Sequence, residues 1–195
     1  MVNMSHGCYQ RSTPLHQVIQ WLEQQGVIMV ASVGNYDCTI PASEGGDSEG
    51  GDSEGGDSEG GDSEGGDSSS GCTWQVKYPA QYPETIAVGA TDETGNIASY
   101  SVEGLAVDVV APGGSGEMPV ISTNLNSGYG LASGTSQATA HVSGLVALLL
   151  DANPDLTPQE VRQILQETAI DLGEPWEAQG AGLVDTEWAV DEAKH

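Results

Sequence analysis

Residues 133–144, SGTSQATAHVSG, lead directly into the apolar run LVALLL at 145–150, and the rest of the chain is best interpreted outward from this stretch. A small, flexible entry before a long apolar run without proline predicts a tight turn and then a buried helix over residues 136–151. Such a helix would span about 24 Å, and polar residues interrupt it, so it does not suit a membrane. Ser136 falls in its first turn, where unpaired N–H groups and the helix dipole favour negative charge. A serine there is well placed to attack a carbonyl, although Ser or Thr before an apolar helix is more often a cap.

The composition is that of one strongly acidic domain. The 195 residues include 4 Lys and Arg against 29 Asp and Glu, which gives a net charge of −25. Nucleic acids and anionic membranes both require a basic protein surface, so we expect neither as a partner. The first residues lack the basic and apolar regions of a signal peptide. The 3 cysteines have no Cys-x-x-Cys spacing, which argues against a zinc site.

Residues 43–67 repeat the pentad Ser-Glu-Gly-Gly-Asp five times, and five Asp and five Glu give −10 of the net charge. The repeat has no apolar residue to bury, so we predict a disordered acidic insert at 43–70 within a domain that spans 1–195. It lacks the spacing of known calcium-binding repeats, which leaves weak, diffuse cation binding as its alternative role. Cys38 and Cys72 bracket the insert. A disulfide between them would imply an oxidising compartment and would leave Cys8 over.

Helix and strand signals alternate along the rest of the chain. A capped helix over 12–22 precedes the apolar run 27–33, which is typical of a parallel strand buried on both faces and ends in Gly34 and Asn35. The further predicted elements are strands at 86–90 and 107–111, a loop at 127–130 and a helix that begins with a capping box at Thr157. This alternation predicts an α/β fold with sites at the carboxyl ends of the strands.

Residues 134–144 resemble the nucleophile motif of the subtilisin-like serine proteases (subtilases). The matching positions are Gly134, Thr135, Ser136, Ala138, His141, Val142 and Gly144, and Ala140 stands where the family usually has proline. The run 30–35, VASVGN, resembles the subtilase strand that ends in the oxyanion-hole asparagine. The resemblance implies that Ser136 is the nucleophile and that Asn35 donates to the oxyanion. It also implies a three-layer αβα sandwich with a mainly parallel sheet, here incomplete at the N-terminus.

The same resemblance implies a peptide-binding cleft. Residues 1–7, MVNMSHG, resemble the strand that pairs with bound substrate, and a peptide would add alongside it by backbone hydrogen bonds. The residues that would line the pockets for substrate side chains are Ser5, His6 and Gly7 on this strand, and Ser32, Val33 and Gly34 on the next. A peptide or protein substrate is the expected partner.

Residues 78–90 resemble a subtilase block that carries a weak structural cation site. The carbonyls that match its ligands belong to Ala80, Tyr82 and Thr85, and Asp108 matches a carboxylate ligand. Such an oxygen-rich set suits Ca²⁺ or Na⁺. The second acidic ligand of the family falls at Ala106, which cannot serve. No catalytic cofactor is expected.

A subtilase catalytic triad runs in the order Asp, His, Ser, and only the serine is recognisable here. No Asp-Ser/Thr-Gly or Gly-Thr-His motif is present. His141 lies roughly 140° around the helix axis from Ser136, His16 lies on another helix, and His195 is terminal. His6 is nearest the expected cleft, but as a pocket residue. We therefore expect the C-terminal half of a subtilase catalytic domain, with the missing N-terminal half as its partner and a secreted or extracellular location.

Three functions follow from these observations. The first is a serine endopeptidase present as a fragment that lacks the catalytic Asp and His. The second is a non-catalytic, peptide-binding pseudoprotease. The third is an acidic cation-binding module, which rests only on the insert. Ser136 and Asn35 favour the first over the second, because a binding module needs neither.

Overall fold

The computed structural model of the protein describes residues 1–36 and 75–195. The predicted insert at 43–70, together with Cys38 and Cys72, lies outside the described residues. Within the described residues no helix is long and apolar enough to cross a membrane.

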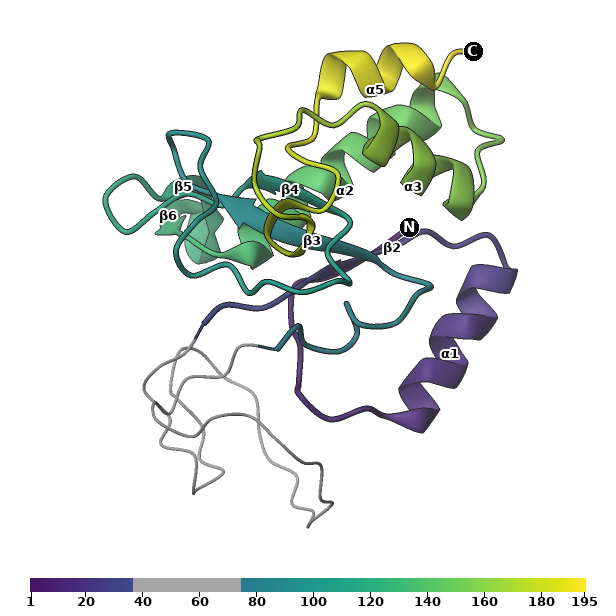
Figure 1. Ribbon diagram of the computed structural model, residues 1–195, viewed down its shortest axis with the longest axis horizontal. Helices are drawn as coiled ribbons and strands as arrows, with labels where there is room; N and C mark the ends of the chain where they lie inside the picture. Colours follow the sequence, from purple (N-terminus) through teal and green to yellow (C-terminus); the bar gives the residue numbers. More distant parts are fainter. Residues whose placement is uncertain (37–74) are drawn as a thin grey trace. The chain divides into compact units, whose positions relative to one another are not determined.

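Four parallel strands form the central sheet in the order β1-β2-β3-β4 (Figure 1). These strands are β1 (Val2–Met4), β2 (Met29–Ser32), β3 (Ile86–Thr91) and β4 (Val109–Pro112). The register places Asn3 beside Val30, Ala31 beside Ala87, and Val88 beside Val109. Every residue of β2 and β3 is buried, as expected for parallel strands covered on both faces. The strands predicted at 27–33, 86–90 and 107–111 are confirmed.

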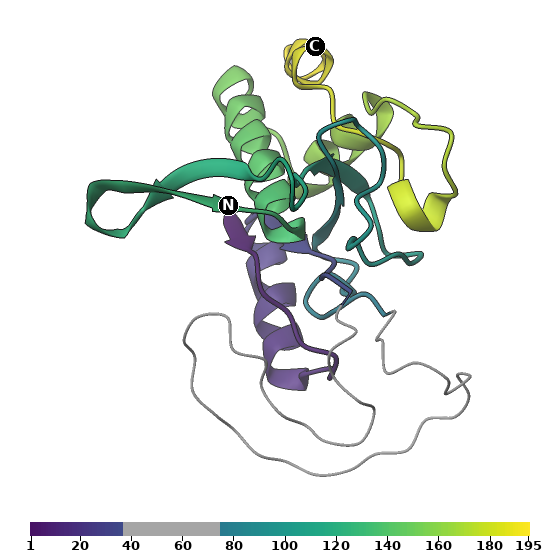
Figure 2. The same ribbon diagram turned by 90° about the vertical axis from the view of Figure 1, so that its left-hand side faces the viewer.

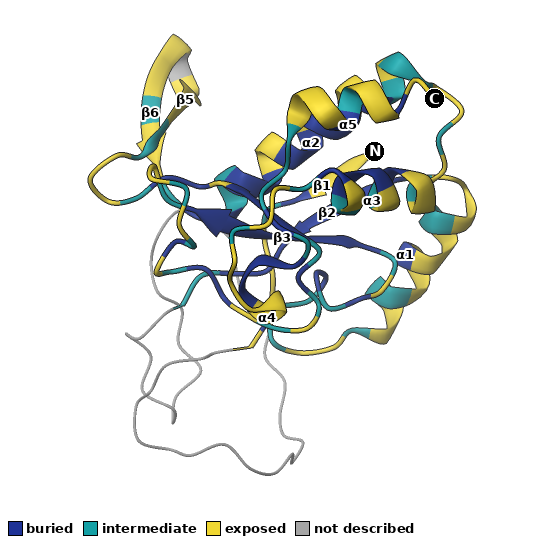
Figure 3. Ribbon diagram, turned by 45° about the horizontal axis from the view of Figure 1, so that its top comes forward, coloured by how far each residue is buried: buried dark blue, intermediate teal, exposed yellow. Residues whose placement is uncertain are grey.

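Helices cover both faces of this sheet, which confirms the predicted three-layer α/β arrangement (Figures 1 and 3). Helix α2 (Thr135–Ala152) packs across all four strands, and α5 (Thr186–Glu192) packs on α2. Helix α3 (Pro158–Glu167) adds Val161, Ile164 and Leu165 to the same core, while α1 (Thr13–Gln24) lies on the opposite side. A short helix, α4 (Trp176–Gln179), precedes α5.

The helix caps are those that the sequence predicts. Ser12 caps α1 by accepting a hydrogen bond from the Leu15 amide at 3.3 Å. Thr157 and Glu160 form a reciprocal capping box at the start of α3.

Two expectations need correction. Helix α2 is not buried on nearly every side: the described neighbours cover only its sheet face and its α5 face. Ala140, Gly144, Ala147 and Leu148 are exposed on the remaining face, and Leu148 keeps 49% of its surface. The helix is therefore an outer layer of the described residues rather than their centre.

The predicted loop at 127–130 is instead part of a β-hairpin that extends away from the central sheet (Figure 2). The hairpin consists of β5 (Val120–Asn124), a 3₁₀ turn (Leu125–Ser127) and β6 (Gly128–Ala132). Its apolar side chains face solvent, with Tyr129 81% and Leu131 66% exposed (Figure 3). The local sequence pattern did not predict this hairpin, because its hydrogen bonds join residues on either side of the turn and the second strand contains two glycines.

Candidate active site

The carboxyl edge of the sheet brings together three segments that are far apart in the sequence. Ser5 follows β1, Asn35 follows β2, and Ser136 lies in the first turn of α2. Parallel strands end at the same edge, so the polar residues that follow them meet there. These three residues form the candidate active site.

Ser136 is tied to the end of β1 by two reciprocal hydrogen bonds. Its Oγ donates to the carbonyl of Ser5 at 2.9 Å, and the Oγ of Ser5 donates to the carbonyl of Ser136 at 3.2 Å. Asn3 Nδ2 donates to the Oγ of Ser5. Ser143, about two turns further along α2 than Ser136, donates to Asn3 Oδ1 at 3.0 Å. The hydroxyl proton of Ser136 therefore goes to a backbone carbonyl and not to a base.

Asn35 is held in one orientation by the residue that precedes Ser136. Its Oδ1 accepts from the amide of Thr135 at 3.0 Å and from the Thr135 hydroxyl at 2.9 Å. Since two donors fix the oxygen, the Nδ2 group is the part of the amide that remains able to donate. A Cβ built on Gly134, where φ is +156°, would lie 3.0 Å from that nitrogen, so the glycine is required for this close approach.

The start of α2 adds a second kind of donor. Gly134 is the N-cap and provides no side-chain hydrogen bond, and the first backbone amides of a helix have no intrahelical acceptor. The amide of Ser136 is one of these, and the helix dipole makes this end favourable for negative charge. Two N–H sources that an oxyanion could use are thus close to the half-buried Ser136 in the chain: its own amide and the Nδ2 group of Asn35, which is bound to the adjacent Thr135.

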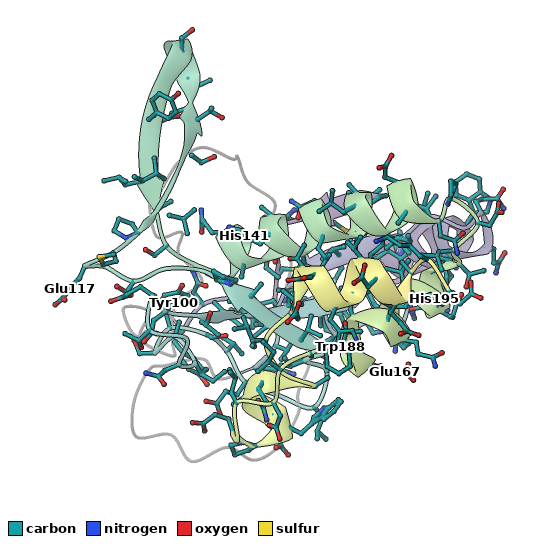
Figure 4. All side chains as sticks on the ribbon, turned by 90° about the horizontal axis from the view of Figure 1, so that it is seen from above. Tyr100, Glu117, His141, Glu167, Trp188 and His195 are labelled. Carbon is teal, nitrogen blue, oxygen red and sulfur yellow. The ribbon has the colours of Figure 1, made fainter. Side chains whose placement is uncertain are left out.

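All four histidines lie in the described part of the chain, and none of them hydrogen-bonds Ser136. His141, on α2 (Figure 4), donates from Nδ1 to the Gln137 carbonyl at 3.0 Å. His16 contacts Glu84 at 3.0 Å and stacks on Tyr82. His6 is exposed, and His195 lies at the end of the chain.

The predicted pocket residues do not all present side chains to the cleft. Ser32 and Val33 are 3% and 0% exposed, so they support the wall from inside the core. Gly7 and Gly34 both lie against one long side chain, that of Lys77. Sequence reasoning missed Lys77 altogether, and it missed the role of Thr135 although that residue is part of the quoted motif.

Asp108, the predicted carboxylate ligand of a cation, lies at the opposite, amino end of the sheet. Its Oδ2 accepts from the amide of Ala87 at 2.8 Å, and its Oδ1 accepts from Gln166 Nε2 at 2.8 Å. Burial raises the pKa of Asp108 above its ordinary value, although Arg162 and these hydrogen bonds act in the opposite direction. The carboxylate is therefore already occupied by groups of the chain.

The guanidinium of Arg162 contacts two of the four predicted cation ligands, the Thr85 carbonyl and Asp108. It donates to the carbonyls of Pro83, at 2.6 Å, and Thr85, and its Nε lies 3.6 Å from Asp108 Oδ1. The carbonyl of Tyr82 accepts from the hydroxyl of Thr85 at 2.9 Å. Among the described residues no cluster of three His, Cys, Asp or Glu side chains could hold a metal ion. Because Arg162 already bonds to the Thr85 carbonyl and lies beside Asp108, cation binding stays a prediction that requires Arg162 to move.

Comparison with known proteins matches almost the whole chain to one family. The subtilase family model, peptidase S8, matches residues 1–184. Subtilisin E of Bacillus subtilis (strain 168) is 35% identical over 190 residues, which cover 97% of this chain and 40% of that protein. A subtilisin of Bacillus pumilus is also 35% identical, and there the match covers 56% of the protein. The chain thus spans about half the length of the curated relatives it matches.

A solved structure of a protease from Pseudoalteromonas arctica PAMC 21717 has a similar fold. Its TM-score is 0.73 at 26% identity, and the match covers 98% of this chain and 50% of that one. The protease domain of PatA, solved as its S218A mutant, gives a TM-score of 0.70 at 24% identity and supports the fold alone.

Proposed function

The chain belongs to the subtilase family, and from that premise we propose that it is the nucleophile-bearing part of a serine endopeptidase. Ser136 attacks the carbonyl carbon of a peptide bond, and Asn35 Nδ2 and the Ser136 amide donate to the developing oxyanion. The observation that carries the proposal is the orientation of Asn35. Thr135 holds its oxygen with two donors, which leaves the NH₂ group to serve an oxyanion beside Ser136.

The substrate is a peptide or protein segment in extended conformation. It would lie beside residues 5–7, which are half-buried or exposed at the end of the edge strand β1. Backbone hydrogen bonds to such a strand bind a peptide without regard to its sequence, and flanking pockets then select side chains.

The base that activates Ser136 comes from sequence outside residues 1–195. A serine hydroxyl is a weak nucleophile until a base takes its proton, and no histidine of this chain contacts Ser136. The match to about half the length of the relatives supports this view. So do the exposed apolar side chains of α2 and the hairpin, since surfaces of this kind usually mark an interface.

With Asp and His supplied, the reaction follows the serine-protease sequence. His takes the proton from Ser136 Oγ as the C–O bond forms, and then gives it to the leaving amine as the C–N bond breaks. Water then attacks the acyl carbon while the same His takes its proton, and the His gives that proton to Ser136 Oγ as the bond between Oγ and the acyl carbon breaks.

A fluorophosphonate probe, which reacts only with an activated serine, tests this proposal. The isolated chain should be labelled barely or not at all, whereas a long form that restores an upstream segment with the Asp and His motifs should be labelled. Ser136→Ala should abolish that labelling. Asn35→Ala should slow turnover of the long form; for the oxyanion-hole asparagine of subtilisin itself the measured loss is about 10²–10³ in kcat. Strong labelling of the isolated chain at Ser136 would contradict the proposal and point to His6 as the base.

A peptide-binding pseudoprotease is the second candidate. The observation that favours it is the hydrogen bond from Ser136 Oγ to the Ser5 carbonyl, which leaves the hydroxyl inactive. A long form that binds extended peptides but is never labelled by the probe would establish this alternative.

We propose only weak cation binding, in which the cation replaces the guanidinium of Arg162. Ca²⁺ at millimolar concentration should raise the melting temperature of Arg162→Ala more than that of the parent chain, because the variant frees the Thr85 carbonyl and Asp108. Equal shifts in both proteins would remove the predicted site.

We also propose a secreted or extracellular location, on the family resemblance and on a disulfide between Cys38 and Cys72. Both cysteines lie outside the described residues, while Cys8 is a free, exposed thiol. Mass spectrometry of the native protein after thiol alkylation should find Cys8 modified and the other two linked. Alkylation of all three would oppose the disulfide.

A further inference from the structure

The segment that ends in Tyr78 joins the two walls of the proposed substrate pocket. The amide of Lys77 donates to the carbonyl of Val33 at 2.9 Å. Tyr78 and Cys8 exchange two backbone hydrogen bonds, at 2.8 and 2.9 Å. Residues 77 and 78 are therefore fixed by backbone hydrogen bonds to the chain that follows β1 and to the chain that follows β2.

The side chain of Lys77 fills the space between Gly7 and Gly34. A Cβ built on Gly7 would lie 2.7 Å from Lys77 Cβ, and one built on Gly34 would lie 2.9 Å from Lys77 Cδ. Real Cβ atoms do not approach other carbons so closely, so glycine on each wall makes room for the lysine stem. A large apolar substrate side chain cannot enter the same space unless the stem leaves it.

The ammonium group of Lys77 has no ion-pair partner within the part of the chain that the structure describes. Its Nζ lies 4.9 Å from the centroid of the Tyr9 ring, a contact worth about 0.5–1 kcal/mol at an exposed site. The ion pairs of the described residues are His16–Glu84, Arg162–Asp108 and Lys194–Asp191, so no described carboxylate pairs with Lys77.

We propose that Lys77 sets the side-chain preference of this pocket, and that the pocket takes a carboxylate side chain, Glu or Asp, immediately before the scissile bond. This inference rests on the proposed function, since it assumes that peptides bind between residues 5–7 and 32–34. A substrate carboxylate pairs with the half-buried ammonium and replaces the weak contact to Tyr9. A substrate lysine meets like charge, and leucine competes with the lysine stem.

Peptide binding to the full chain tests the inference without any need for catalysis. The probes are N-acetyl-trialanyl peptides that end in Glu, Gln, Ala, Leu or Lys amide, titrated into ¹⁵N-labelled protein while the amides of Gly7 and Gly34 are observed. We expect the Glu peptide to bind about tenfold more tightly than the isosteric Gln peptide at low ionic strength. The ratio should fall at 0.5 M salt, because a partly exposed ion pair is screened. The net charge of −25 weakens the binding of every anionic peptide. The decisive quantity is therefore the ratio of Glu-peptide to Gln-peptide affinity, compared between the parent chain and its variants.

Lys77→Met keeps the aliphatic stem and removes the charge, so it should abolish the Glu over Gln preference. Lys194→Met is the matched control, because it removes the same charge from an exposed pair with Asp191 near the C-terminus and should leave the preference intact. If Lys77→Met does not fold, Lys77→Gln provides the same comparison.

The outcomes separate this inference from the function on which it rests. Equal binding of the Glu and Gln peptides, or a preference for Ala that survives Lys77→Met, would overturn the role of Lys77 and leave the peptide site in place. Failure of every peptide to perturb Gly7 and Gly34 would overturn the peptide site and this inference together.

Discussion

The two ends of the parallel sheet carry polar clusters of opposite character. At the carboxyl end, Ser136, Asn35 and Ser5 are joined by neutral hydrogen bonds, and the Asn35 amide retains donors for a further partner. At the amino end, Asp108 and Arg162 are charged and are bound by groups from β3, α3 and the loop before β3. At the amino end both Asp108 oxygens are bound, and the buried Arg162 Nε is the described side-chain atom without a hydrogen-bond partner. The contrast indicates that free donors near a nucleophile, and not the number of polar residues, separate a site that can act on a ligand from one that holds the fold.

The largest loss of stability is expected when the guanidinium at the amino end is removed. Arg162→Met leaves the Asp108 carboxylate buried and two carbonyls without their donor, and we expect the free energy of unfolding to fall by about 3 kcal/mol. Lys194→Met removes an exposed ion pair and should cost less than about 1 kcal/mol. Urea unfolding of both variants measures the contrast. Similar losses in the two would show that the amino-end cluster is an ordinary surface pair.

A smaller effect is expected at the carboxyl end from Tyr100→Phe. The Tyr100 hydroxyl donates to the Gly114 carbonyl at 2.7 Å, and its loss should cost about 1 kcal/mol at neutral pH. Burial, with the carboxylates of Asp92 and Glu93, raises the pKa of Tyr100 to about 12. The folded chain therefore keeps a proton that the unfolded chain loses near pH 10, so stability falls as the pH rises from about 10 towards 12.

Unfolding curves between pH 8 and pH 11 for the parent chain and Tyr100→Phe measure this alkaline dependence. The variant should lose less stability over that range, by up to about 1 kcal/mol after allowance for partial solvent exposure. Parallel pH profiles would show that the phenol titrates as it does in the unfolded chain.

Ser143→Ala tests how much stability a neutral hydrogen bond contributes at the carboxyl end. The single proton of the Ser143 hydroxyl is shared between Asn3 Oδ1 and the Thr139 carbonyl, and Asn3 Nδ2 in turn donates to Ser5 Oγ. The exposed Asn3 can bond to water instead, so we expect a loss of about 0.5–1 kcal/mol, well below that of Arg162→Met. Thermal unfolding gives the size, and a loss equal to that of the charged variant would erase the distinction between the two ends.

The smallest effect concerns the acid side of the pH profile. Burial opposes ionisation of Glu84, but hydrogen bonds from its own amide, Gln20 and His16 outweigh burial, so its pKa lies below the ordinary 4.5. Its contribution to stability is present above pH 4.5 and is lost as the pH falls through the lowered pKa. Glu84→Gln should flatten the acid limb of the stability profile and leave the alkaline limb unchanged. An unaltered acid limb would mean that other carboxylates control it.

Much of the fold followed from local signals. The capping residues Ser12 and Thr157, the buried runs at 27–33 and 86–90, and the motif around Ser136 each depend on neighbours within a few positions, so the sequence predicted helices, parallel strands and the edge where Ser136 and Asn35 meet. The hairpin β5–β6 and the open face of α2 were missed, because pairing across a turn and the coverage of a helix depend on segments that the local pattern does not specify.

The sequence by itself determined the family, the nucleophile candidate and its oxyanion partner, since these are carried by contiguous motifs. Only the tertiary structure decided which atoms of those residues are in use. In the folded chain, two donors of Thr135 fix the orientation of the Asn35 amide. Arg162 of α3 lies beside Asp108, and Lys77 packs against Gly7 and Gly34. The physical reason is that such contacts join residues from separate segments, and their geometry exists only once the strands and helices have packed against one another.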